Sequence, residues 1–127
     1  MDNPMCNEID TVLFETKDPL GRTISLSSNR YYEHIISSDM NHQAHPEFTP
    51  DEIKKAIESP EVIYKSVFPD SDVYFGKTSS LYPKLYLKVP VAIYENNTTG
   101  EVQTAFLSKH ISGNIDERGL KYVKSRL

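Results

Sequence analysis

A strictly alternating segment spans residues 84–94. Aliphatic side chains occupy every second position, namely Leu85, Leu87, Val89, Val91 and Ile93. Because successive side chains of a β-strand point to opposite faces, this pattern predicts one face for a hydrophobic core. The opposite face carries Lys84, Tyr86 and Lys88, which can meet a phosphate and a ring together. The segment therefore predicts a half-buried strand and a surface suited to nucleic acid.

The chain has 127 residues, which is the size of one domain with a single core. No run of about 18 apolar residues is present, so no membrane-spanning helix is predicted. The first residues lack the basic and apolar regions of a signal peptide. The single cysteine, Cys6, cannot form an intramolecular disulfide. These features predict a soluble, cytoplasmic protein with no membrane partner.

Charge is distributed unevenly along the chain, whose net charge is −4. Residues 1–61 hold 12 acidic and 5 basic side chains, a balance of −7, whereas residues 62–127 hold 6 and 9, a balance of +3. The positive charge therefore lies in the half that contains the alternating strand, where phosphate contacts would need it. The alternative interpretation is that solvated surfaces simply differ in charge, since +3 is a mild excess.

Cap and turn signals divide the chain into short elements. The clearest boundary is Thr49-Pro50-Asp51-Glu52, which combines an N-cap threonine, a proline at the first helical position and a capping-box glutamate. Pro60 ends this helix near Ser59. Apolar spacing predicts another helix at about residues 29–40. Strands are expected over residues 11–16, 22–26, 61–68, 72–76, 84–94 and 101–111.

These elements predict a three-part organisation. We expect residues 1–10 to form a flexible N-terminus, residues 11–113 to fold as one domain and residues 114–127 to form a basic tail. The first two strands would form a hairpin, and the last two would pair antiparallel across a turn at residues 96–100. Helices precede most of the sheet, which is typical of an α+β arrangement. The tail is interpreted as either a short amphipathic helix or a mobile basic arm.

An ordered set of short motifs extends over residues 22–110. It includes Tyr32-Glu33-His34-Ile35, His45-Pro46-Glu47-Phe48, Tyr74-Phe75-Gly76-Lys77 and Leu87-Lys88-Val89-Pro90-Val91. In this order the motifs resemble the barnase/EndoU/colicin/RelE-like (BECR) superfamily of small ribonucleases, and in particular its phage-type branch. No single motif is specific, so the resemblance depends on their order.

The resemblance implies an α+β fold in which an N-terminal β-hairpin and two helices pack on a four-stranded antiparallel sheet. It also implies a metal-independent, toxin-like endoribonuclease that needs no cofactor and that a protein partner can neutralise. In such enzymes the 2′-hydroxyl of RNA attacks the adjacent phosphate and leaves a 2′,3′-cyclic phosphate. That reaction needs a base, an acid, and a cation or hydrogen-bond donors for the phosphate.

Three histidines are candidates for proton transfer, because imidazole titrates near neutral pH. His34 is the first choice, since the helical wheel places it away from the apolar stripe of its helix; a solvated position is the alternative. His45 lies in a loop, and His110 ends a strand. His42, His45 and Glu47 include zinc-ligand types, but they lie in a loop with no cysteine or second histidine pair, so no metal site is predicted.

The remaining predicted site residues lie on strands. Lys88 is expected to contact phosphate, with a charged solubility position at a sheet edge as its alternative. The Thr104 hydroxyl is expected to donate a hydrogen bond to phosphate. Thr104 shares its predicted strand face with Val102 and Phe106. Tyr74 fits a core position as well as a stacking position. The residues assigned to substrate binding are Lys77, Lys84, Tyr74 and Tyr86.

These assignments predict RNA as the partner and cleavage as the activity. A noncatalytic RNA- or protein-binding domain of the same fold is the alternative, favoured by the overall acidity of the chain. A third interpretation is an adaptor or inhibitor that binds a basic protein through its acidic first half.

Overall fold

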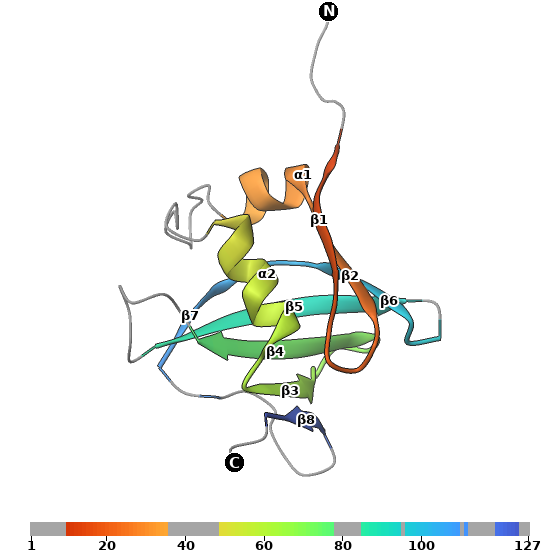
Figure 1. Ribbon diagram of the computed structural model, residues 1–127, viewed down its shortest axis with the longest axis vertical. Helices are drawn as coiled ribbons and strands as arrows, with labels where there is room; N and C mark the ends of the chain where they lie inside the picture. Colours follow the sequence, from red (N-terminus) through yellow and green to blue (C-terminus); the bar gives the residue numbers. More distant parts are fainter. Residues whose placement is uncertain are drawn as a thin grey trace, which may run out of the picture.

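A single mixed β-sheet dominates the protein (Figure 1). The computed structural model describes residues 10–35, 49–77, 85–94, 96–109, 111 and 119–124, with residues 34 and 35 described by their backbone alone. Within this part, the strand order is β1-β2-β6-β5-β4-β3-β8, and β7 pairs with β5. The strands are β1 (Val12–Lys17), β2 (Thr23–Ser27), β3 (Val62–Lys65), β4 (Ser71–Lys77), β5 (Tyr86–Tyr94), β6 (Thr99–Val102), β7 (Phe106–Ser108) and β8 (Leu120–Val123).

Helix α2 (Pro50–Glu58) lies across one face of the sheet, against β1, β4 and β5 (Figure 1). It begins where the sequence predicts, because the Thr49 side chain accepts a hydrogen bond of 3.2 Å from the backbone N–H of Glu52. The other helical segments are α1 (Ser28–Arg30) and the π-helical η2 (Tyr31–Ile35). None of the described helices is long and apolar enough to cross a membrane.

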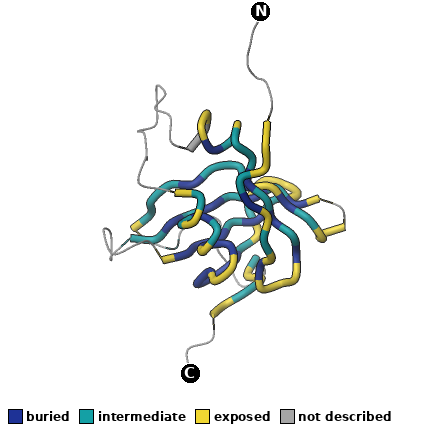
Figure 2. The backbone as a smooth tube through the Cα atoms, turned by 45° about the horizontal axis from the view of Figure 1, so that its top comes forward, coloured by how far each residue is buried: buried dark blue, intermediate teal, exposed yellow. Residues whose placement is uncertain are grey.

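The hydrophobic core lies between α2 and the sheet. Leu87, Val89 and Val91 point toward the helix, whose Ile53 and Ile57 are fully buried. Figure 2 shows this buried layer running through the central strands. The alternation predicted for β5 is therefore confirmed on its aliphatic side.

Helix α2 approaches the sheet closely at Gly76 of β4. A Cβ atom at this position would lie 2.6 Å from the Cβ of Ala56, closer than real side chains approach. A larger residue here would push the helix away from the sheet, so glycine sets the distance between the two layers.

The predicted fold of two helices on a four-stranded antiparallel sheet is wrong. Over the described residues the sheet has eight strands and is mixed, since β2 runs parallel to β6. The N-terminal hairpin extends the sheet through this parallel pair instead of packing on it. The helix expected at residues 29–40 begins with the short α1 and η2 segments, and residues 36–40 lie outside the described residues. Local periodicity did not reveal these pairings, because the partners are far apart in the sequence.

The C-terminal segment also differs from its prediction as a helix or basic arm. Residues 120–123 form β8, which pairs antiparallel with β3 and extends the sheet. Tyr122 packs against the core, so this strand contributes to the domain rather than standing apart from it. The rest of the expected tail lies outside the described residues apart from residues 119 and 124, as do residues 1–9.

The single strand expected at residues 101–111 is interrupted. It forms β6 and β7, and between them the N–H of Gln103 donates to the carbonyl oxygen of Pro90 over 2.9 Å. Val102 pairs with Val91 on the core side, whereas Phe106 pairs with Lys88. The predicted face shared by Val102 and Phe106 is therefore wrong, because the break shifts the alternation.

Candidate functional site

The sheet face opposite α2 carries a hollow of about 630 Å³. Strands β3, β4, β5 and β7 supply residues to it, and the turn between β3 and β4 adds the exposed Val67 and Phe68. Most of its lining is apolar or aromatic, as in sites that bind small organic groups. Its central side chains are Tyr64, Val73, Phe75, Lys88, Pro90, Thr104 and Phe106.

Strand register explains why these side chains meet. Phe75 pairs with Lys88, which pairs on its other side with Phe106. Because neighbours across a ladder share a face, the three side chains form one row across β4, β5 and β7. The alternate residues Tyr74 and Leu87 point to the core.

Lys88 lies between two aromatic rings. Its Nζ atom is 5.6 Å from the centre of the Phe75 ring and 5.5 Å from that of Phe106. Both distances are in the range of a cation–π contact. Within the described part of the chain Lys88 has no carboxylate partner, and its side chain is half-buried. The site therefore presents a cation, held in an apolar setting, that has no counter-ion among the described residues.

Hydrogen-bonding groups border the same hollow. Thr104 and Gln103 both line it, because the break between β6 and β7 turns two consecutive residues toward this side. Gln103 Nε2 donates to the carbonyl oxygen of Glu101 over 3.3 Å. The Thr104 and Tyr64 hydroxyls make no hydrogen bond to the described residues. These two hydroxyls can therefore donate to, or accept from, a ligand in the hollow.

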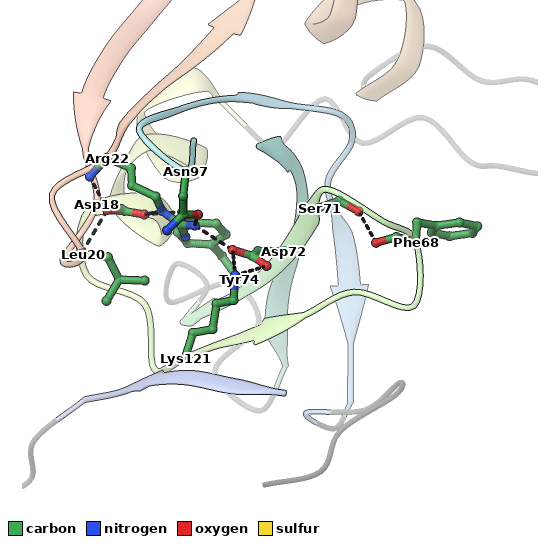
Figure 3. A network of polar contacts seen from close by, with 9 residues as sticks. All are labelled: Asp18, Leu20, Arg22, Phe68, Ser71, Asp72, Tyr74, Asn97 and Lys121. Carbon is green, nitrogen blue, oxygen red and sulfur yellow. Dashed lines mark hydrogen bonds and ion pairs between the residues drawn. The ribbon is translucent and has the colours of Figure 1, made fainter. Parts of the chain in front are cut away.

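A buried polar cluster closes one end of the sheet (Figure 3). Its centre is Arg22, only 2% exposed, whose Nε donates to Asp18 over 2.9 Å. Arg22 Nη1 donates to Asp72 and to Asn97, each over 2.7 Å. Its Nη2 donates to the Tyr74 hydroxyl over 2.9 Å, and that hydroxyl donates to Asp18. The cluster ties the β1–β2 turn to β4 and to the β5–β6 turn.

Burial and polar contacts raise the pKa values of two members of this cluster, Tyr74 and Arg22. Burial, together with the hydrogen bond to Asp18, raises the pKa of the Tyr74 hydroxyl far above its ordinary value. Burial lowers the pKa of Arg22, but Tyr74, Asp72 and Asp18 outweigh this effect and raise it overall. Lys121 adds a second cation, with Nζ 3.1 Å from Asp72. The two cations balance the two carboxylates, and the arrangement is that of a structural clamp.

Sequence reasoning missed this cluster. The available signal was Asp72 and Tyr74 at alternate positions of a strand, both on the side where apolar residues are expected. Arg22 gives no local signal, because its partner Asp72 lies 50 residues further along the chain.

A second, more polar cleft of about 460 Å³ lies beside the cluster. The turn between β5 and β6 forms one side, with Asn96 and Asn97 at positive φ angles of 56° and 71°. Asparagine adopts this conformation more readily than most residues. The lining residues include Lys65, Asp70, Ser71, Asp72, Tyr94, Asn97 and Lys121.

The structure brings some of the predicted site residues together. Lys88 and Thr104 line the same hollow. Lys77 and Tyr86 pair with each other on the same sheet face, but neither lines the hollow. Tyr74 is fully buried and bonded to Arg22, which corrects its assignment as a stacking residue.

The other assignments stay predictions. The side chain of His34 is not described, and His45, His110 and Lys84 lie outside the described residues. His42 and Glu47, considered for zinc, also lie outside them. Among the residues that are described, no group of three histidine, cysteine, aspartate or glutamate side chains is placed to hold a metal ion.

A scan against protein-family models and searches of curated proteins and of solved structures give no match. The resemblance to the BECR ribonucleases therefore rests on the sequence motifs alone.

Proposed function

We propose that the open face of the sheet binds single-stranded RNA, with a base against the rings of the hollow and a phosphate on Lys88. The observation that carries this proposal is the position of Lys88 Nζ, 5.6 Å and 5.5 Å from two ring centres and without a carboxylate partner in the described chain. A ring surface beside an uncompensated cation matches a base beside its phosphate.

The apolar lining favours an unpaired base over a duplex. In a duplex the flat faces of the bases stack on one another, whereas a base in a single strand can enter a hollow and stack on a protein ring. Each such stacking contact contributes about 1–3 kcal/mol. Phe106 supplies the inner ring, and the exposed Phe68 supplies one at the rim, whereas Phe75 is fully buried beneath Lys88 and supports it from below.

The surrounding charge predicts a weak dependence on salt. Lys65 and Lys77 lie near the hollow, but Asp70 and Glu101 offset them. Each neutralised phosphate adds about 0.7 to the slope of log affinity against log salt for a single strand. With Lys88 as the main phosphate contact, we expect a slope of about −1.

Binding is tested by fluorescence anisotropy with a short labelled single-stranded RNA. Lys88→Gln should weaken binding about tenfold, the effect of losing one charge-assisted contact. Lys55→Gln, on the exposed side of α2, removes the same charge from the other side of the molecule and should leave affinity unchanged. Equal losses in the two variants, or no binding by the unaltered protein, would refute the proposal.

Cleavage of the bound RNA is a second candidate, favoured by the presence of both Lys88 and Thr104 at the hollow. Lys88 would contact the phosphate, and the Thr104 hydroxyl would donate a hydrogen bond to it. The test is incubation with RNA in EDTA across a range of pH, followed by analysis of the product ends. A 2′,3′-cyclic phosphate that disappears in His34→Ala supports toxin-like cleavage; RNA that is bound but stays intact at every pH selects binding alone.

A further inference from the structure

The hollow and the polar cleft are contiguous. Both are bordered by Lys65, Asp70 and Ser71 at the turn between β3 and β4. The outward side chains of β5 lead from Lys88 at the first to Tyr94 at the second. These two positions are six residue steps apart along the strand, or about 20 Å. A ligand longer than one nucleotide can therefore continue from one cleft into the other.

The amide of Asn97 at the polar cleft has a fixed orientation. Its Oδ1 accepts from Arg22 Nη1 over 2.7 Å, and a guanidinium group can only donate. Arg22 is itself held by Asp18 and Tyr74. The Asn97 Nδ2 group, which has no partner among the described residues, therefore remains as a donor at an exposed position.

The nearest buried carboxylate is already engaged by two cations. Asp72 Oδ2 accepts from Arg22 and from Lys121, and its Oδ1 lies 3.1 Å from Lys121 Nζ. Ser71 also uses its hydroxyl hydrogen internally, in a bond to the carbonyl oxygen of Phe68. The fixed side chain of Asn97 thus favours a ligand that presents an acceptor.

We propose that the polar cleft is a second nucleotide subsite, in which a base stacks on Tyr94 and is read through an acceptor oxygen by the Asn97 amide. This inference rests on the proposed binding of RNA. Tyr94 is 46% exposed and borders the cleft, so its ring is accessible. Uracil presents a carbonyl oxygen at the position where cytosine presents an amino donor. The subsite should therefore prefer uracil to cytosine.

The experiment compares the affinities of labelled oligouridylate and oligocytidylate of equal length. The unaltered protein should bind oligouridylate about fivefold more tightly, as expected for one discriminating hydrogen bond. Asn97→Asp keeps the acceptor for Arg22 and tolerates the positive φ, but it replaces the outward donor with an acceptor. The ratio of the two affinities should fall to one or reverse.

Further variants test whether the change in the affinity ratio is specific to Asn97. Asp70→Asn alters another of the polar side chains at the cleft and should leave the ratio unchanged. Lys88→Gln should weaken both oligonucleotides equally. Should thermal unfolding show that Asn97→Asp is not folded, Asn97→Gly fits the same backbone conformation, lacks the donor and should bring the ratio to about one.

The outcomes separate this inference from the proposed function. Binding of both oligonucleotides with equal affinity, or a ratio that Asn97→Asp leaves unchanged, would overturn the second subsite and leave RNA binding in place. A ratio that changes in Asp70→Asn instead would mean that Asp70, and not Asn97, distinguishes the two bases, and would overturn the subsite as proposed. Failure of the unaltered protein to bind either oligonucleotide would refute both proposals.

Discussion

The two faces of the central sheet come from the same strands but differ in what covers them. On one face Leu87, Val89 and Val91 are buried beneath α2. On the other, Lys88 and Pro90 remain half-buried at an open hollow. Neighbouring residues of one strand can therefore be changed with separate consequences. We expect the covered face and its polar end to determine stability, and the open face to determine binding.

The severest test of this difference is Arg22→Met at the polar end of the covered face. The substitution leaves two buried carboxylates, Asp18 and Asp72, without their shared cation, and should lower the free energy of unfolding by about 3–5 kcal/mol. Urea denaturation measures the loss. The control Lys55→Met, on the exposed side of α2, should change stability by less than about 0.5 kcal/mol. A loss of similar size in both variants would contradict the role of the Arg22 cluster as a structural clamp.

A paired comparison tests the two faces directly. Ile57→Ala opens a cavity between α2 and the sheet and should cost about 2–5 kcal/mol. Val73→Ala removes a half-buried side chain from the hollow and should cost about 1 kcal/mol or less. Thermal and urea unfolding of both variants provide the measurement. Equal costs would mean that the open face contributes to the core as much as the covered one.

The buried tyrosine of the clamp predicts how stability depends on pH. The pKa of Tyr74 is raised in the folded protein, whereas an unfolded tyrosine titrates near 10. Above about pH 10 the unfolded chain loses a proton that the folded protein keeps, so stability present below this pH is lost as pH rises. Tyr74→Phe should cost about 1–3 kcal/mol at neutral pH and flatten the decline above pH 10. If the stability of Tyr74→Phe declines equally steeply above pH 10, other titrating groups cause the decline.

A small effect on stability is expected at Lys88. Lys88→Gln removes two cation–π contacts but no ion pair with a described residue, so it should cost only about 0.5–1 kcal/mol. The same variant should lose about tenfold in RNA affinity. Chemical denaturation measures the change in stability, and fluorescence anisotropy measures the change in RNA affinity. If stability falls by several kcal/mol, the weaker binding would no longer identify a contact residue.

Elements with local signals could be predicted from the sequence. Thr49 and Pro50 place the start of α2 because a cap depends on residues three positions apart. The aliphatic alternation of β5 likewise identifies its buried side, since every other residue reports the same face. The turn of the first hairpin follows from a short segment that ends in Gly21, at a φ of 86°.

Features that depend on distant partners could not be predicted. The pairing of β8 with β3 joins Tyr122 to Ile63, and neither segment signals the other. The break between β6 and β7 was missed because Gln103, Thr104 and Ala105 contain no glycine or proline. Of the candidate site, Lys88 and its face were visible in the sequence, whereas its two rings came from other strands.

The parallel pairing of β2 with β6 attaches the N-terminal hairpin to the sheet through a short backbone ladder. Only three residue pairs join the two strands, Thr23 to Thr99, Ile24 to Gly100 and Ser25 to Glu101. Contacts with α2 and the Arg22 cluster supply the rest. In native-state amide hydrogen exchange, the backbone N–H groups of β1 and β2 should therefore exchange through an opening that leaves β4 and β5 protected. The hairpin would be the first cooperative unit to separate from the sheet.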